Sequence, residues 1–175
     1  MQATEYNQTP LKNKRFTKMI RMIAACARNR VMGSKGTLPW KINEDWEYFL
    51  KTTEGGVLLM GRRCYEDFTE YASTRQLVVL SRDPDKTFTH ASKAASLKEG
   101  IKLAQSMGEN IWICGGAEIY KHAMPMSEEL YLTQIDQDYE GDVKFPAWEE
   151  HFKTEISRKT VTTDGLTLSF LILGR

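Results

Sequence analysis

The 175-residue chain lacks several features that would place it in a specialised class of protein. No apolar run is long enough to cross a membrane. The formal net charge of +1 provides no broad basic surface for nucleic acid. Only three cysteines are present, Cys26, Cys64 and Cys114, and their spacing is not that of a metal site. An odd number of cysteines in or beside apolar runs predicts reduced, buried thiols in a cytoplasmic protein, with no metal centre.

The composition is that of an ordinary globular protein, with 41% hydrophobic and 27% charged residues. The length supports one domain with a substantial core. Residues 1–18 are polar and partly basic, and we predict a flexible tail there, with a targeting segment as the less favoured alternative. Residues 19–175 then form the domain.

Strand and helix patterns alternate along this domain. Apolar runs predict strands at residues 19–26, 57–60, 77–80, 111–114 and 130–135, with another short strand at 87–91. Helices are predicted at residues 43–53, 62–68, 96–107 and 117–124, and a loop at 28–40. Residues 152–162 and 166–173 alternate around Asp164-Gly165, which predicts a hairpin. The expected fold is a single-domain α/β sandwich, with a mostly parallel sheet flanked by helices and an antiparallel C-terminal edge.

Asp45 is the most informative residue. It follows Leu38-Pro39-Trp40, and Asn43 is a candidate cap for a helix that begins at Glu44. At helical spacing Asp45 shares a face with large apolar side chains, where a carboxylate is costly unless it is paired. A solvated charge at a helix start is the simpler interpretation of this segment alone. The other interpretation is a carboxylate kept for a ligand.

Three junctions between strands and helices suggest a phosphate-bearing ligand. Gly115-Gly116 separates a buried strand from a helix, where free backbone N–H groups attract phosphate. Arg62 and Arg63 follow a second strand, and Ser81-Arg82 follows a third. Because the carboxyl ends of parallel strands meet at one edge of a sheet, these groups are expected to converge on a phosphorylated dinucleotide.

Several short motifs, in order, resemble the dihydrofolate reductase family from about residue 19 to residue 175. They are Ile23-Ala24-Ala25, Val31-Met32-Gly33, Leu38-Pro39-Trp40, Asp45, Met60-Gly61-Arg62, Val78-Val79-Leu80-Ser81, Gly115-Gly116-Ala117-Glu118-Ile119-Tyr120, Leu130-Tyr131-Leu132-Thr133, Glu140-Gly141-Asp142 and Phe145-Pro146. The resemblance implies an eight-stranded, mostly parallel sheet flanked by helices. It also implies NADPH as cofactor, dihydrofolate as substrate, and a monomer.

The resemblance also implies individual roles. Asp45 matches the carboxylate that holds the pterin, Thr133 the hydroxyl that supports it, and Trp40 the indole that orders a nearby water. Leu38 lies on the loop that closes over nicotinamide, and Asp142 matches a residue that hydrogen-bonds the closed loop. The implied catalytic residues are Asp45, Leu38, Trp40 and Thr133. The implied substrate-binding residues are Ile23, Ala24, Ala25, Asp45, Trp46, Phe49, Phe68, Arg75, Cys114, Tyr120 and Thr133.

The implied cofactor-binding residues extend across the sheet edge. They are Ala25, Met32, Gly33, Thr37, Leu38, Gly61, Arg62, Arg63, Cys64, Leu80, Ser81, Arg82, Cys114, Gly115, Gly116, Ala117, Glu118, Ile119 and Tyr120.

The sequence departs from the family pattern around the implied site for the benzoylglutamate tail. Residues 70–74 replace a Leu-Pro-Gly-like run, Leu77 stands where Asn is usual, and Trp46 where an aliphatic residue is common. Arg75 matches the arginine that binds the α-carboxylate of the tail. A solvated arginine, or one paired with Glu70, is the alternative.

The resulting hypothesis is an NADPH-dependent dihydrofolate reductase. Two rivals remain from the sequence. One is a reductase of the same fold that acts on another pterin or on a ribosylaminopyrimidine of riboflavin synthesis. The other is a non-catalytic NADPH-binding protein.

Overall fold

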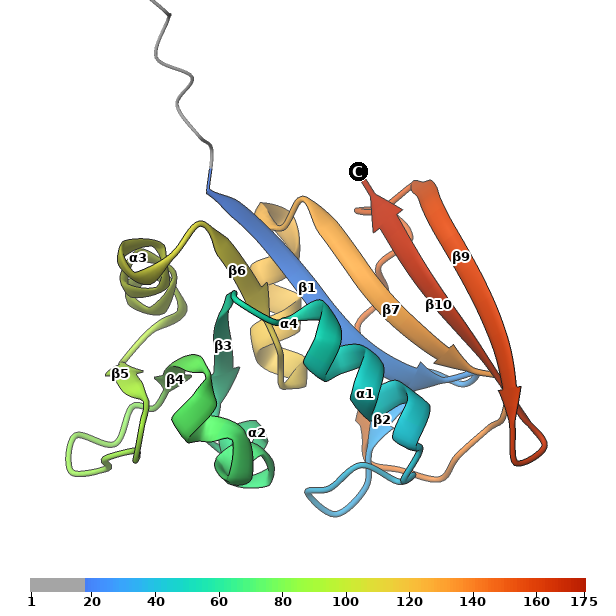
Figure 1. The fold of residues 1–175 in the computed structure, drawn as a ribbon, viewed down its shortest axis with the longest axis horizontal. Coiled ribbons are helices and arrows are strands. Elements are labelled where there is room, and N and C mark those ends of the chain that lie inside the picture. Colours follow the sequence, from blue (N-terminus) through green and yellow to red (C-terminus); the bar gives the residue numbers. More distant parts are fainter. Residues whose placement is uncertain (1–17) are drawn as a thin grey trace, which may run out of the picture.

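A computed structural model describes residues 18–175, and the tail predicted at residues 1–18 lies outside this range except for Lys18. An eight-stranded sheet forms the centre (Figure 1). In sheet order its strands are β5 (Ser92–Ala94), β4 (Gln76–Leu80), β3 (Val57–Gly61), β6 (Asn110–Ile113), β1 (Met19–Ala27), β7 (Glu129–Ile135), β10 (Leu166–Gly174) and β9 (Thr154–Thr163). The pairs from β5 to β7 are parallel, and β10 is antiparallel to both β7 and β9. The predicted α/β fold is confirmed.

Helices cover both faces of this sheet (Figure 1). One face carries α1 (Asn43–Thr52) and α2 (Arg62–Phe68), and the other carries α3 (Leu97–Met107) and α4 (Ala117–Ala123). Neighbouring residues of one strand enter opposite cores: on β1, Met22 packs toward α3 and α4, and Ile23 toward α1 and α2. Strands buried on both faces read as continuous apolar runs, which is why the sequence revealed them.

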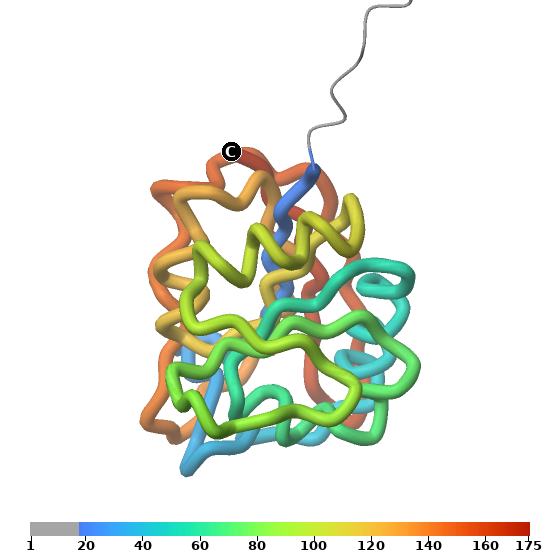
Figure 2. The backbone as a smooth tube through the Cα atoms, turned by 90° about the vertical axis from the view of Figure 1, so that its left-hand side faces the viewer, coloured from blue at the N-terminus to red at the C-terminus, as the bar shows by residue number. Residues whose placement is uncertain are grey.

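Short elements complete the chain. They are the 3₁₀ helices η1 (Thr69–Thr74) and η2 (Met124–Met126), and a two-stranded sheet of β2 (Val31–Gly33) and β8 (Val143–Lys144). β2 was missed because residues 28–40 were predicted as a loop, and neither η1 nor β8 was predicted. The start of β1 and the C-terminal residue lie at the same end of the molecule in both views (Figures 1 and 2).

Two local predictions were wrong. A strand was expected at residues 87–91, but β5 is Ser92–Ala94. The chain turns at His90, whose φ is 56°, and Phe88 packs edge-on against Tyr65 with ring centroids 5.1 Å apart. Residues 87–91 therefore serve as a packed connection and contribute nothing to the ladder.

Asn43 does not cap the first helix. The helix begins at Asn43 itself, Ile42 occupies the capping position without a side-chain hydrogen bond, and the Ile42 carbonyl accepts from Trp46 N at 3.2 Å. The negative side chains of the first turn, Glu44 and Asp45, still face the positive end of the helix.

Candidate active site

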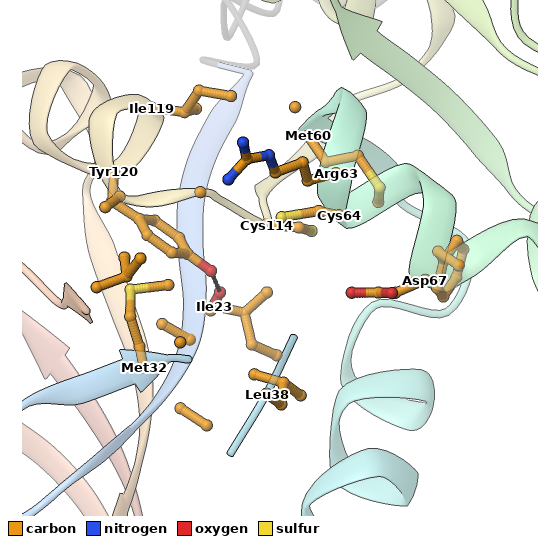
Figure 3. A pocket seen from close by; sticks show the side chains of 18 of the residues that line it. Ile23, Met32, Leu38, Met60, Arg63, Cys64, Asp67, Cys114, Ile119 and Tyr120 are labelled. Carbon is orange, nitrogen blue, oxygen red and sulfur yellow. Dashed lines mark hydrogen bonds between the residues drawn. The ribbon is translucent and has the colours of Figure 1, made fainter. Parts of the chain in front are cut away.

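A cavity of about 800 Å³ opens at the carboxyl ends of β1, β3 and β6 (Figure 3). Its walls come from α1, α2 and α4, and the loop that follows β2 contributes Gly36, Thr37 and Leu38. The Leu38 side chain is 47% exposed in this loop. The topology therefore brings segments from residue 23 to residue 143 around one space.

Most of the residues expected at the site line this cavity. They are Ile23, Ala24, Ala25, Met32, Gly33, Thr37, Leu38, Asp45, Trp46, Phe49, Gly61, Arg62, Arg63, Cys64, Phe68, Arg82, Cys114, Gly116, Ala117, Glu118, Ile119, Tyr120 and Thr133. Five expected residues do not line it: Trp40, Arg75, Leu80, Ser81 and Gly115. Leu80 packs into the core beside Gly100, and Ser81 Oγ accepts from Asp83 N at 3.3 Å.

Asp45 projects from the first turn of α1 into the cavity. Burial raises the pKa of this carboxyl to about 6, and interactions with the Thr133 hydroxyl and the Trp40 indole counteract part of the rise. The side chain remains partly exposed toward the cavity. Asp45 is thus a weakly solvated carboxylate that ionises just below neutral pH and faces an open space.

Trp40 lies behind Asp45 and outside the cavity lining. Its side chain is 6% exposed and packs edge-on against Tyr139, with ring centroids 5.2 Å apart. The Trp40 Nε1 atom is buried and has no hydrogen-bond acceptor among residues 18–175. A buried indole N–H beside a carboxylate is suited to donate a hydrogen bond to an ordered water or to a ligand.

Gly115 makes the turn between β6 and α4 possible. Its φ of 105° is one that residues with side chains rarely adopt, and a Cβ there would lie 2.9 Å from the Tyr120 ring. The Tyr120 hydroxyl donates to the carbonyl of Ile23 at 2.6 Å, which fixes α4 against β1 (Figure 3). Gly115 acts through this close packing, while Gly116 leaves open space at the start of α4.

Exposed guanidinium groups surround one end of the cavity. Arg63 and Arg82 have no ion-pair partner in the described part of the chain, whereas Arg62 pairs with Glu66 at 3.0 Å. These side chains come from two different strand ends, as the sequence predicted. The rim is therefore cationic and solvated, in contrast to the surroundings of Asp45.

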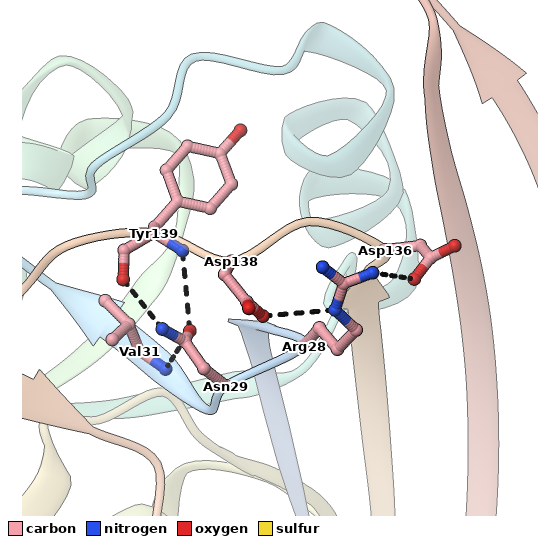
Figure 4. Close-up of polar contacts among 6 residues, drawn as sticks. All are labelled: Arg28, Asn29, Val31, Asp136, Asp138 and Tyr139. Carbon is pink, nitrogen blue, oxygen red and sulfur yellow. Dashed lines mark hydrogen bonds and ion pairs between the residues drawn. The ribbon is translucent and has the colours of Figure 1, made fainter.

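The loop after β2 is tied to the segment that precedes β8. Asp142 N donates to the Gly33 carbonyl at 3.1 Å, and an Asp142 carboxylate oxygen accepts from Lys35 N at 3.2 Å. Below these contacts, Asn29 Nδ2 donates to the Tyr139 carbonyl at 2.8 Å (Figure 4).

Arg28 reinforces the same connection. Its guanidinium pairs with Asp138 at 3.1 Å and with Asp136 at 3.3 Å (Figure 4). Two chain segments more than 100 residues apart thus position the cavity loop together.

Arg75 lies outside the cavity, at the end of η1. Its Nη2 donates to the carbonyl of Leu50 at 2.9 Å, and its Nη1 is buried without a partner in the described residues. The alternative pairing of Arg75 with Glu70 is not present. The guanidinium borders a separate polar hollow of about 510 Å³.

Comparison with known proteins extends this geometry. The family model of dihydrofolate reductase matches residues 19–175. The dihydrofolate reductase of Neisseria meningitidis serogroup A is 36% identical over 158 residues, which cover 87% of this chain and 95% of the relative. That of Bacillus subtilis is 33% identical over 146 residues, covering 83% and 86%. This chain belongs to the dihydrofolate reductase family.

A solved structure of the family has the same fold. Dihydrofolate reductase from Enterococcus faecalis, determined in complex with NADP(H) and RAB-propyl, superposes with a TM-score of 0.82. The match covers 91% of this chain and 98% of the other, at 25% identity. The resemblance derived from the short motifs is therefore confirmed.

Five residues of the cavity lining were not among the expected site residues: Gly36, Tyr48, Met60, Asp67 and Val143. Gly36 lies in the loop predicted at residues 28–40, and Met60 lies in the Met60-Gly61-Arg62 motif, so the sequence contained a signal for both. Asp67 carried no such signal, since it resembles any other polar residue of a surface helix. Its carboxylate points into the cavity (Figure 3), and burial raises its pKa.

The cysteine prediction was only partly right. Cys26 is buried, but Cys64 and Cys114 are partly exposed at the cavity wall. Burial raises the pKa of Cys64 to about 11, so this thiol is protonated at neutral pH. Among residues 18–175, no three His, Cys, Asp or Glu side chains are grouped so that they could hold a metal ion. The described helices are all too short or too polar to cross a membrane.

Proposed function

We propose that this chain reduces 7,8-dihydrofolate to tetrahydrofolate with NADPH, and so supplies one-carbon metabolism. The observation that carries the proposal is Asp45, a weakly solvated carboxylate on the wall of a cavity whose other end is ringed by cations. Asp45 suits the amino group and ring N–H of a pterin, and the cationic rim suits a phosphorylated dinucleotide.

The residues present fit NADPH. The close packing at Gly115 and the open space at Gly116 leave room at the start of α4, and Arg63 and Arg82 face the rim with no protein carboxylate attached. Bound NADPH supplies a hydride from C4 of its nicotinamide to C6 of the dihydropterin. Leu80 and Ser81 lie outside the cavity lining, so the cationic rim rests on the arginines.

Asp45 holds the dihydropterin in one orientation through two charge-assisted hydrogen bonds. Its negative charge in a weakly solvated site also favours the protonated ring, so that N5 takes up a proton from water. Thr133 supports the carboxylate, and the free Trp40 N–H orders a water next to it. Leu38 and its loop cover the reacting atoms and exclude bulk water.

Arg75 is proposed to bind the α-carboxylate of the glutamate tail. Its buried Nη1 has no partner among the described residues, and a planar carboxylate is the group that a guanidinium accommodates best. Because Arg75 lies outside the cavity lining, the tail must pass the cavity wall to reach it.

The chain is further proposed to act as a cytoplasmic monomer without a nucleic-acid partner. The formal net charge of +1 offers no broad field for nucleic acid, and three free thiols suit a reducing compartment. Light scattering of the purified chain, with one mass near 20.1 kDa expected, tests the oligomeric state.

The deciding experiment follows NADPH oxidation with three substrates: dihydrofolate, a dihydropterin without the benzoylglutamate tail, and a ribosylaminopyrimidine. We expect turnover with dihydrofolate that Asp45→Asn largely abolishes. Turnover with only the dihydropterin or the ribosylaminopyrimidine would favour the rival reductases. Binding of NADPH without oxidation by any of the three would favour a non-catalytic protein.

A further inference from the structure

Four aromatic rings meet at the wall of the cavity, and three of them, Trp46, Phe49 and Phe68, line it. Trp46 and Phe49 come from α1, while Phe68 and Tyr71 come from α2 and η1. Trp46 stacks on Phe49 with centroids 5.4 Å apart and meets the edge of Phe68 at 6.0 Å. Phe68 in turn stacks on Tyr71 at 5.4 Å. Side chains from three elements therefore touch one another directly.

One hydrogen bond joins the two sides of this aromatic cluster. Trp46 Nε1 donates to the Tyr71 hydroxyl at 3.1 Å, and the two rings also pack edge to face at 5.4 Å. Trp46 lines the cavity, but Tyr71 does not. The bond therefore links the cavity wall to a residue behind it, and holds α1 against η1.

Arg75 connects the same two elements, because it follows η1 and is bonded to α1. Its guanidinium is bonded to the carbonyl of Leu50, the residue after Phe49, and borders the second hollow with Ser73 and Thr74. A buried guanidinium N–H without a partner costs free energy, so an incoming carboxylate is favoured there. In this structure Arg75 is not part of the cavity lining, although Trp46, Phe49 and Phe68 are.

We propose that Trp46 and Tyr71 form a gate that determines specificity for the tail of the substrate. With their hydrogen bond intact, the cavity accepts the pterin ring but is closed toward Arg75. Binding of dihydrofolate breaks the bond, because the benzoylglutamate must pass between α1 and η1. A substrate without the tail leaves the gate closed. This inference rests on the proposed function and concerns its selectivity.

The hydrogen bond that closes the gate reduces the apparent affinity only for substrates that carry the tail. If only a fraction of the molecules has an open gate, the apparent dissociation constant of dihydrofolate equals the intrinsic constant divided by that fraction. Tyr71→Phe removes the hydroxyl but keeps the ring and its contacts with Phe68. We expect this variant to lower KM for dihydrofolate by about three- to tenfold, the range of one neutral hydrogen bond, and to leave KM for the tailless dihydropterin unchanged.

Tyr65→Phe is the matched control. The Tyr65 hydroxyl also donates one hydrogen bond, to the carbonyl of Thr89 at 2.7 Å, and the residue is outside the cavity lining. It should change neither KM. Because Trp46 and Tyr71 share one bond, Tyr71→Phe should have no further effect on KM in a Trp46→Phe background.

Three results would overturn the gate. They are an unchanged or raised KM for dihydrofolate in Tyr71→Phe, an equal change for both substrates, and an effect that is fully additive with Trp46→Phe. Arg75→Ala should raise KM for dihydrofolate by roughly ten- to a hundredfold and spare the dihydropterin. No change would mean that the gate does not lead to Arg75. Absence of dihydrofolate turnover in the unmodified chain would instead refute the proposed function.

Discussion

The two charged ends of the cavity differ in how the protein surrounds their charges. At one end Asp45 lies against apolar side chains, and burial raises its pKa to about 6 even though Thr133 and Trp40 lower it in part. At the other end Arg63 and Arg82 extend from strand ends into solvent. The same Coulomb interaction is much stronger where water is excluded than where it is abundant.

Because of this difference, the two ends of the cavity are suited to two different tasks. A partly desolvated carboxylate affects the protonation of a neighbouring ring strongly, and it costs the folded protein stability when it is ionised. Exposed guanidinium groups select a doubly charged phosphate, each with a moderate and salt-sensitive effect. Substitutions at the two ends should therefore differ in size, in pH dependence and in salt dependence.

The largest effect is expected for Asp45→Asn on turnover at neutral pH. The amide keeps the shape but loses the anion, and a lost electrostatic contribution of about 3–4 kcal/mol lowers kcat by roughly a hundred- to a thousandfold. NADPH affinity should be preserved, which fluorescence titration can check. Part of the activity should return at acid pH, where the substrate protonates unaided. If Asp45→Asn were as active as the original chain at pH 7, Asp45 would not be the catalytic carboxylate.

The same substitution should stabilise the protein without ligands. The pKa of Asp45 is about 6 in the fold against 3.8 for an ordinary carboxyl. Between these values the folded state binds more protons than the unfolded state, so stability falls as pH rises and stays reduced above about pH 6. Asn does not ionise and avoids this loss.

The free energy of unfolding of Asp45→Asn, relative to the original chain, should therefore rise by about 2–3 kcal/mol between pH 3.5 and pH 8. Urea denaturation at both pH values measures the change. A pH-independent difference would show that Asp45 is not held in a costly charged state.

A smaller effect is expected at the cationic rim. Exposed charge-assisted contacts contribute about 1.5 kcal/mol each, so Arg82→Ala should reduce the preference for NADPH over NADH by roughly tenfold. The double change with Arg63→Ala should reduce it by roughly a hundredfold, with less effect at high salt. Arg158→Ala is a suitable control because Arg158 pairs with Glu155 on the edge strand β9. Equal efficiency with both cofactors in the original chain would refute the convergence on a phosphate.

The smallest effect is expected for Arg62→Ala. Arg62 is on the same rim but is already paired with Glu66, and both side chains are about half exposed at 48% and 50%. The loss of this pair should lower stability by about 0.3–0.5 kcal/mol and alter cofactor preference less than Arg82→Ala does. If Arg62→Ala changed cofactor preference more than Arg82→Ala does, Arg62 and not Arg82 would be the arginine that binds the phosphate.

The sequence alone determined the elements whose cause is local. Continuous apolar runs marked the strands of the parallel sheet, and glycines marked the turns at their ends. The relation of Asp45 to its apolar neighbours followed from helical spacing. Because short motifs kept their order, most of the cavity lining was predicted as well, from residue 23 to residue 133.

Tertiary structure decided the features that depend on distant partners. Asp67 enters the cavity only because α2 packs beside α1, and β2 exists only because β8 pairs with it. The hydrogen bond between Trp46 and Tyr71 spans 25 residues, and no pattern in the sequence relates an indole to a phenol at that distance. Periodicity specifies which face a side chain occupies on its own element, whereas the packing of elements decides which side chains meet across a cavity.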